Sequence, residues 1–153
     1  MGIEIKGVNS LCDKLENLNN NIDRNVRSKV EMLAQEISDE AKDLAPVDTG
    51  FLRENIYWSV EDKENRVEAE IVSNADYGGY VEFGTGKVGE SAGLVREGIS
   101  LAYRQTPWRY KDEEGKWHYT EGMKPQPYLY PAMKQNEDRV KEELKSAITM
   151  ELK

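Results

Sequence analysis

The sequence is poor in the residues that build disulfides and metal centres. Its 153 residues include one cysteine, Cys12, and one histidine, His118. A lone cysteine cannot form an internal disulfide, and Cys12 lies on the apolar side of a helical pattern, so we expect a small buried side chain and not a reactive thiol. One histidine and one distant cysteine cannot supply the usual ligands of a transition-metal cluster. We therefore expect no metal site and no cofactor.

Long apolar runs are also missing. No stretch approaches the roughly 18 apolar residues that a membrane span requires. Residues 1–6 lack the basic start and the apolar centre of a signal peptide. The expectation is a chain without a membrane segment that stays in the cytoplasm, or leaves it by a route other than secretion.

Basic residues are fewer than acidic ones. The chain has 21 Lys and Arg against 29 Asp and Glu, a net charge of −8. A nonspecific grip on phosphate backbones depends on clustered Lys and Arg, so nucleic acid is not expected as the main ligand. With 38% hydrophobic and 33% charged residues, the composition indicates a modest core and much solvated surface. The length favours one domain over residues 1–153.

Two short matches to catalytic motifs fail in their context. Asp-Thr-Gly at residues 48–50 is the triplet of aspartic proteases, but here it follows a helical pattern and a proline, and no second triplet exists to complete the pair of carboxylates. Residues 84–87 resemble a phosphate loop, yet Val81 and Val88 stand where a Walker motif needs glycine and Ser or Thr. We expect no catalytic residue, and the protein is not predicted to be an enzyme.

What the chain does have is a long helical stripe in its first third. Apolar residues recur every three or four positions from residue 11 to residue 44. An unbroken helix here would be roughly 50 Å long, more than a domain of this size can cover. The asparagines at positions 17 and 19–21 are weak helix formers, so a break near them is the alternative. Either version leaves apolar surface that suggests subunit packing, against the plainer reading of two amphipathic helices in a monomer.

A rigid corner is predicted where this helix pattern ends. Proline disfavours the helical conformation of the residue before it, glycine accepts a positive φ, and short polar side chains bond nearby backbone N–H groups. An apolar anchor and a guanidinium follow, an arrangement suited to locking a corner against a sheet. The residues concerned are Pro46, Asp48, Thr49, Gly50, Leu52 and Arg53.

The next segments alternate as strands do. Residues 56–60 and 67–71 have period two, with a polar turn at 62–65, and read as an antiparallel hairpin with one wet face. A second turn follows, made by Glu82, Phe83, Gly84 and Thr85. Because Arg53 and Glu82 are each an isolated charge in an apolar motif, and a buried charge needs a partner, we expect them to pair.

Residues 84–123 form a long loop that contains an aromatic hairpin. Strand-like segments at 108–111 and 116–119 flank a turn at 112–115, which places residue 110 opposite 117 and residue 108 opposite 119. Such pairs contribute roughly 0.2–1 kcal/mol each, too little for an isolated hairpin. The face therefore packs either on a partner or on the domain's own sheet. Its members are Trp108, Tyr110, Trp117 and Tyr119. Residues 89–106 are expected to be a short helix or a loop that orders on contact with a partner.

Prolines precede a last helix. Pro127 lies in an extended segment, and Pro131 is suited to the first position of a helix. The apolar stripe of that helix is Met133, Val140, Leu144, Ile148 and Leu152.

Three of these motifs, taken in order, resemble one family. They are Ala-Pro-Val-Asp-Thr-Gly at 45–50 with Leu-Arg at 52–53 and Ile56, Tyr-Val-Glu-Phe-Gly-Thr at 80–85, and Pro-Gln-Pro-Tyr-Leu-Tyr-Pro-Ala at 125–132. The chain is similar to the tail-component family of tailed bacteriophages, which includes head–tail joining and tail-completion proteins, and to minor tail protein Z of lambdoid phages. It departs from the family at Asn55, at Tyr128 and in the length of residues 86–123.

The resemblance implies an α+β fold, with a long N-terminal helix and a C-terminal helix packed on a small, mostly antiparallel sheet and a long loop/hairpin insertion. It also implies a non-enzymatic ring, commonly hexameric, at the head–tail junction of the virion, assembled in the host cytoplasm. Its neighbours would be a connector or stopper and tail-tube or tail-terminator proteins, and DNA would pass through without specific binding. The alternatives are a tail terminator or other minor tail protein and, more distantly, a regulatory binding module of a mobile element.

Overall fold

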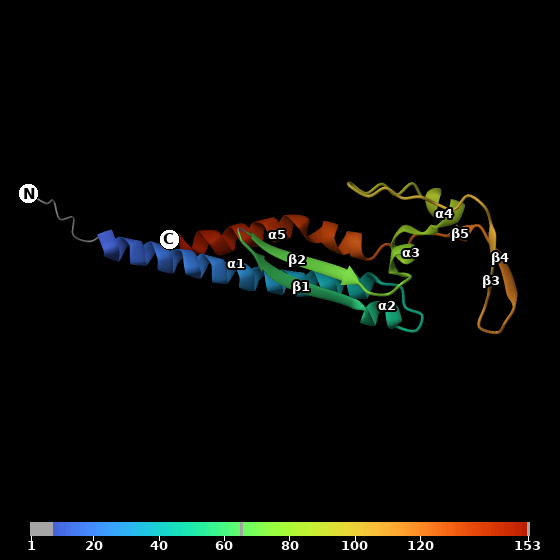
Figure 1. Cartoon of the computed structure of the whole chain (residues 1–153), viewed down its shortest axis with the longest axis horizontal. Helices are drawn as coiled ribbons and strands as arrows, with labels where there is room; N and C mark the ends of the chain where they lie inside the picture. Colours follow the sequence, from blue (N-terminus) through green and yellow to red (C-terminus); the bar gives the residue numbers. More distant parts are fainter. Residues whose placement is uncertain (1–7, 65, 153) are drawn as a thin grey trace, which may run out of the picture.

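The computed structural model describes residues 8–64 and 66–152, with side chains described from residue 13 onward. The predictions for residues 1–6 and for the Cys12 side chain lie outside these residues. Two long helices, α1 (Val8–Leu44) and α5 (Leu129–Glu151), lie side by side, and the strands β1 (Ile56–Lys63) and β2 (Arg66–Ser73) run along α1 (Figure 1). The predicted α+β fold is confirmed.

Helix α1 runs through the asparagine-rich stretch without a break. Its 37 residues make it about 55 Å long. It ends where predicted: the Ala45 backbone N–H donates to the Ala41 carbonyl at 3.0 Å, and Pro46 follows. Only the C-terminal part of α1 is buried, from Leu33 to Ala41, whereas residues 13–31 contain no buried side chain. The unbroken version of the helix is therefore correct, and its first half lies largely in solvent.

The β1–β2 pair is an antiparallel ribbon that is longer than predicted. Its register runs from Ile56 opposite Ser73 to Lys63 opposite Arg66. The polar turn expected at 62–65 is wrong, because the pairing continues through Asp62 and Lys63. An ion pair from Arg27 of α1 to the Asp62 carboxylate holds that end of the ribbon to the helix. The ribbon packs along α1, but the predicted alternation of burial is only partly present: Ile56 is buried, whereas Trp58 and Ala69, which were predicted on the same apolar face, are exposed.

The core is small and lies at one end of the helix pair. It forms where the last turns of α1 and the start of α5 meet two short helices, α2 (Phe51–Glu54) and α3 (Gly78–Phe83). Tyr128 and Ile56 are among its fully buried side chains, and the Tyr128 hydroxyl donates to the Gly78 carbonyl at 3.3 Å. The whole chain exposes 11580 Å², against about 7,900 Å² expected for a folded monomer of 17.5 kDa. The shape is extended.

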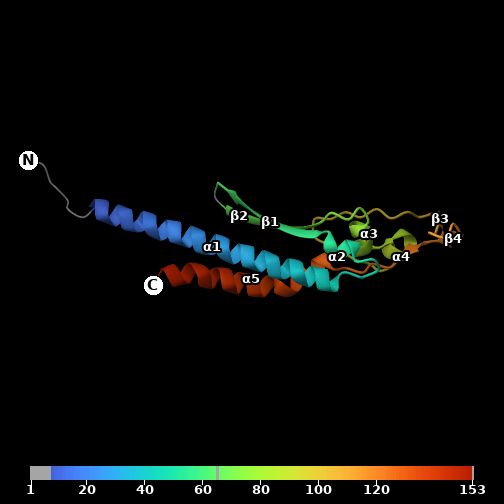
Figure 2. The ribbon, with the colours of Figure 1, turned by 90° about the horizontal axis from the view of Figure 1, so that it is seen from below.

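The insertion leaves the body beside α3 and returns to the same place. It contains a short helix, α4 (Gly86–Glu90), and three short strands, β3 (Trp108–Lys111), β4 (Trp117–Thr120) and β5 (Gly122–Met123). β3 and β4 form a second two-stranded sheet, separate from β1–β2. Residues 91–107 are irregular chain. Figure 2 shows the insertion beyond the C-terminal end of α1, with β3 and β4 at the far end of the molecule.

No helix within the described residues is long and apolar enough to cross a membrane.

Candidate assembly interface

The corner after α1 is held by hydrogen bonds between side chains and the backbone. Gly50 has a φ of 89°, in the left-handed region that favours glycine. The Phe51 backbone N–H donates to the Thr49 hydroxyl at 3.3 Å, and the Arg53 Nε donates to the Lys42 carbonyl at 2.8 Å. Arg53 thus ties α2 to the last turn of α1, while Leu52 beneath it is buried. The chain turns at the predicted residues and Thr49 makes the expected kind of bond, whereas Asp48 makes no side-chain hydrogen bond among the described residues and its carboxylate is exposed.

Glu82 has a different partner from the one predicted. Its Oε2 accepts hydrogen bonds from the backbone N–H groups of Tyr128 at 2.8 Å and Leu129 at 2.9 Å, and its Oε1 accepts from Tyr130 at 3.2 Å. Among the described residues no ion pair joins Arg53 to Glu82, so that prediction is wrong. The reason is that the first N–H groups of a helix lack partners inside the helix and carry partial positive charge. Glu82, 4% exposed, meets that need for α5.

Proline completes this junction. Helix α5 begins at Leu129, so Pro131 is its third residue and not its first, as had been predicted. Proline has no N–H, so none is left without an acceptor at that position. The Tyr128 side chain makes no capping hydrogen bond, and Glu82 takes that role from α3. Pro127 lies in the extended segment before the helix, where the neighbouring Gln126 N–H donates to the Val81 carbonyl at 2.7 Å. The second and third motifs are therefore one structural unit.

The insertion is pinned to the body at a close crossing of its two ends. Thr85 pairs with Met123 and Gly86 with Gly122, and the Met123 N–H donates to the Thr85 hydroxyl at 3.0 Å. A Cβ on Gly122 would lie 1.9 Å from the Thr85 carbonyl oxygen, so only glycine allows this approach. Gly84 is also crowded, with the Met123 carbonyl oxygen 2.6 Å from the place a Cβ would occupy.

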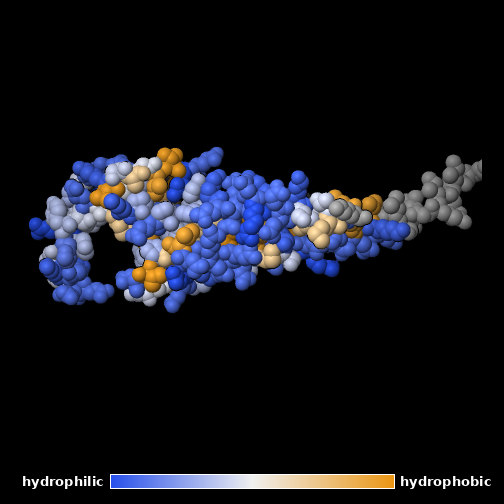
Figure 3. Space-filling model, turned by 180° about the vertical axis from the view of Figure 1, so that it is seen from behind, coloured by the Kyte–Doolittle hydropathy of each residue, from blue (hydrophilic) through white to orange (hydrophobic). Residues whose placement is uncertain are grey.

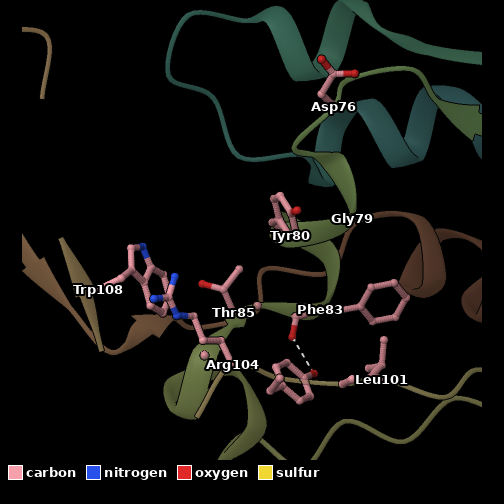
Figure 4. Close-up of a pocket in the computed structure, with 12 residues that line it drawn as sticks. Asp76, Gly79, Tyr80, Phe83, Thr85, Leu101, Arg104 and Trp108 are labelled. Carbon is pink, nitrogen blue, oxygen red and sulfur yellow. Dashed lines mark hydrogen bonds between the residues drawn. The ribbon is translucent and has the colours of Figure 1, made fainter. Parts of the chain in front are cut away.

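A pocket of about 770 Å³ opens between α3 and the insertion (Figure 4). Tyr80 and Phe83 line it from α3, and Arg104 and Trp108 line it from the insertion. The Phe83 carbonyl accepts a hydrogen bond from the Tyr103 hydroxyl at 3.0 Å. The Arg104 guanidinium carbon lies 5.2 Å from the Trp108 ring centre. The lining is aromatic and lacks a pair of carboxylates, and no group of three or more metal-ligating side chains occurs within the described ranges.

The aromatic hairpin forms, but its register is one residue away from the prediction. Lys111 pairs with Trp117, Tyr110 with His118, and Trp108 with Thr120. The four aromatic residues therefore do not share one face. Trp108 and Tyr110 lie on one side of the hairpin, and Trp117 and Tyr119 lie on the other.

A carboxylate and the histidine set this register. Asp112 Oδ2 lies 2.6 Å from His118 Nε2, and Asp112 Oδ1 accepts from the Lys116 N–H at 2.8 Å. The hydrogen bond with His118 makes the largest contribution to lowering the pKa of Asp112, and the hydrogen bond from the Lys116 backbone lowers that pKa further. The Asp112 backbone N–H also donates to the Lys116 carbonyl at 3.0 Å, so Asp112 and Lys116 face each other across the turn. Lys116 therefore belongs to the turn, and the strand begins at Trp117. His118 stacks on Tyr110 with 5.3 Å between ring centres. Sequence analysis had missed this function of Asp112.

Comparison with known families finds one match. Residues 9–84 match the model of the family HK97-gp10_like, described as "Bacteriophage HK97-gp10, putative tail-component". The match includes the corner and Glu82 and ends where the insertion begins. No curated protein and no solved structure matches the chain significantly.

Proposed function

The chain belongs to the HK97-gp10-like family of phage tail components, and from that premise we propose that it completes the tail or joins it to the head as one subunit of a ring at the head–tail junction. In this proposal it is a structural, non-enzymatic protein of a phage or prophage virion. The ring is hexameric, and its neighbours are a connector or stopper on one side and tail-tube or tail-terminator proteins on the other.

The observation that carries the ring is the surface that the single chain leaves uncovered. Its accessible area of 11580 Å² is about one and a half times the area expected at this mass. Apolar side chains lie exposed at the end of the helix pair that is away from the core: Leu15 is 56% exposed near the start of α1 and Met150 is 73% exposed near the end of α5. Figure 3 shows hydrophobic residues reaching the surface towards the N-terminal end as well as around the core end. Such surfaces are typical of subunits that pack in an assembly.

The charge supports a conduit for DNA. A ring with a net charge of −8 on each subunit repels the phosphate backbone, so DNA can move past it without being retained. This favours passage over specific binding of DNA.

A second candidate within the virion is a tail terminator or another minor tail protein. The same uncovered surface fits either position, because each is a ring around the tail axis. A regulatory binding module of a mobile element is the more distant candidate, and a strict monomer that binds a host protein would favour it.

The test is to delete the gene from its phage or prophage and to image the particles by electron microscopy. Full heads with detached, regular tails are the expected result for joining, whereas tails of irregular length would indicate termination. A plasmid copy of the wild-type gene serves as the control and should restore whole particles. Normal infectious particles from the deletion strain would overturn the proposal.

A further inference from the structure

We propose that the β3–β4 hairpin of one copy docks on the corner of a second copy through four residues that point away from its own body. These four residues, Arg109, Lys111, Trp117 and Tyr119, are called the outer hairpin face below. The receiving surface, called the corner patch, consists of Val47, Asp48, Phe51, Glu54, Asp76 and Tyr77. This contact would join neighbouring subunits of the proposed ring, and its place in a virion rests on the proposed function.

The outer hairpin face combines large aromatic side chains with cations. Trp117 is 64% exposed and Tyr119 is 68% exposed. Arg109 lies over the Tyr119 ring at 5.8 Å, and Lys111 lies over the Trp117 ring at 5.9 Å. Among the described residues neither cation has an ion-pair partner. Trp, Tyr and Arg are the side chains that dominate binding energy at protein interfaces, so this face has the chemistry of a contact surface.

The hairpin also lacks support inside its own chain. Beyond its own pairing, neither β3 nor β4 packs extensively on another helix or strand among the described residues. Figure 3 shows it set off from the body by an open gap. A two-stranded hairpin alone is marginally stable in water, so a partner surface would stabilise it.

The corner patch has the complementary composition. Val47 is 58% exposed, Phe51 is 50% exposed, and the Phe51 ring lies 6.2 Å from that of Tyr77. A pocket of about 310 Å³ opens beside them, lined by Val47 and Tyr77 with the buried Leu52. This pocket can receive one aromatic ring.

Carboxylates surround this apolar centre. Asp48, Glu54 and Asp76 are exposed, and within the described ranges none of the three has an ion-pair partner. Unpaired cations on the outer hairpin face and unpaired carboxylates on the corner patch make the two surfaces complementary in charge as well as in apolar character.

The geometry favours a second copy over the chain's own corner. Trp108 lines the pocket beside α3, so the hairpin side that carries Trp108 and Tyr110 faces the body (Figure 4). Successive strand residues point to opposite sides, which directs Arg109 and Lys111 away from it. A contact between two different surfaces runs head to tail and can close into a ring, as the proposed function requires.

The experiment is sedimentation velocity of the purified full chain from about 1 to about 100 µM at low salt, the range of weak protein contacts. Wild type should self-associate, and Arg109→Glu with Lys111→Glu should weaken this at least tenfold, roughly. Lys14→Glu with Lys145→Glu makes the same change in net charge on the helices and should behave as wild type. Circular dichroism confirms that each variant is folded.

A mixture of two charge-reversed variants gives the decisive test. A chain with Asp48→Lys and Glu54→Lys should also fail to associate alone, but a mixture with the Arg109→Glu, Lys111→Glu chain should associate, because opposite charges then meet between copies. Wild type that stays monomeric at the highest concentration, variants that associate as wild type does, or a mixture that stays monomeric would each overturn the contact. Association that behaves as expected, together with normal particles from the deletion strain, would keep the contact and reject the function.

Discussion

The part of the chain that matches the family and the insertion that follows it are held together in different ways. The body, residues 9–84 with Tyr128 and α5, is organised around buried side chains such as those of Ile56 and Tyr128 and around a buried carboxylate, Glu82. In the insertion the β3–β4 hairpin has no buried residue and is ordered by local bonds such as Asp112–His118. The difference suggests that stability is located in the body and partner choice in the insertion.

The largest expected effect comes from removing the insertion. Replacement of residues 87–121 by a short glycine linker should leave a cooperatively unfolding body, because Thr85 and Met123 are already paired. The self-association that depends on the contact between the hairpin and the corner patch should be lost. Circular dichroism melting and sedimentation velocity measure the two properties. A modest fall in Tm is expected, since Arg96, 3.8 Å from the Tyr130 ring centre, is removed; a chain that no longer folds would show that the two regions are one cooperative unit.

Glu82→Ala should destabilise the body and leave the residues of the insertion unchanged. Three backbone N–H groups at the start of α5 would lose their acceptor, which should cost about 3 kcal/mol and lower Tm by about 10 °C. Glu121→Ala, an exposed carboxylate in the insertion, is the matched control and should change stability by less than about 0.5 kcal/mol. Equal Tm values for the two variants would contradict the capping role. Denaturant unfolding followed by circular dichroism gives both free energies.

Gly122→Ala should loosen the insertion and spare the body. The new Cβ would meet the Thr85 carbonyl oxygen at 1.9 Å, so the crossing must open. We expect residues 91–107 to be cleaved several times faster in limited proteolysis, with little change in Tm. Gly79→Ala, where a Cβ meets nothing within 4 Å, should be cleaved as wild type is. A fall in Tm as large as that of Glu82→Ala would mean that the crossing supports the core.

The smallest effect is a pH dependence on the surface of the body. Hydrogen bonds from Lys134 and Lys141 lower the pKa of Glu137 to about 2 from 4.5. Because the folded value is depressed, the stabilisation is present above pH 4.5 and is lost as pH falls from there towards 2. Glu137→Gln should therefore be slightly less stable than wild type at pH 7 and equal to it near pH 2. A difference that persists at pH 2 in urea unfolding would mean that something other than charge is involved.

The sequence was sufficient for the elements whose signals are local. The helix pattern from residue 11 to 44, the alternation at 56–60 and the Pro-to-Gly corner each depend on neighbours in the chain, and all three appear in the structure. The asparagines did not break α1, because α5 and the ribbon cover the helix beyond them and propensity alone is a weak influence.

The predictions that were wrong concerned contacts between distant segments and a strand register that differed by one residue. Glu82 accepts hydrogen bonds from residues that follow it by 46 to 48 positions in the chain. Its charge is balanced by backbone N–H groups, which every residue type except proline has, so no particular residue in the sequence indicates the contact. Two signals could have identified it: a glutamate within an apolar motif, and a helix start that lacks a capping side chain. The hairpin register depended on whether the turn ended at Gly115 or Lys116, and the Asp112 carboxylate decided it.

The crossing of Thr85 with Met123 and Gly86 with Gly122 has a consequence for how such proteins diversify. A segment whose two ends already meet can be lengthened, shortened or traded between genomes by recombination at just two places, and the rest of the polypeptide keeps its path.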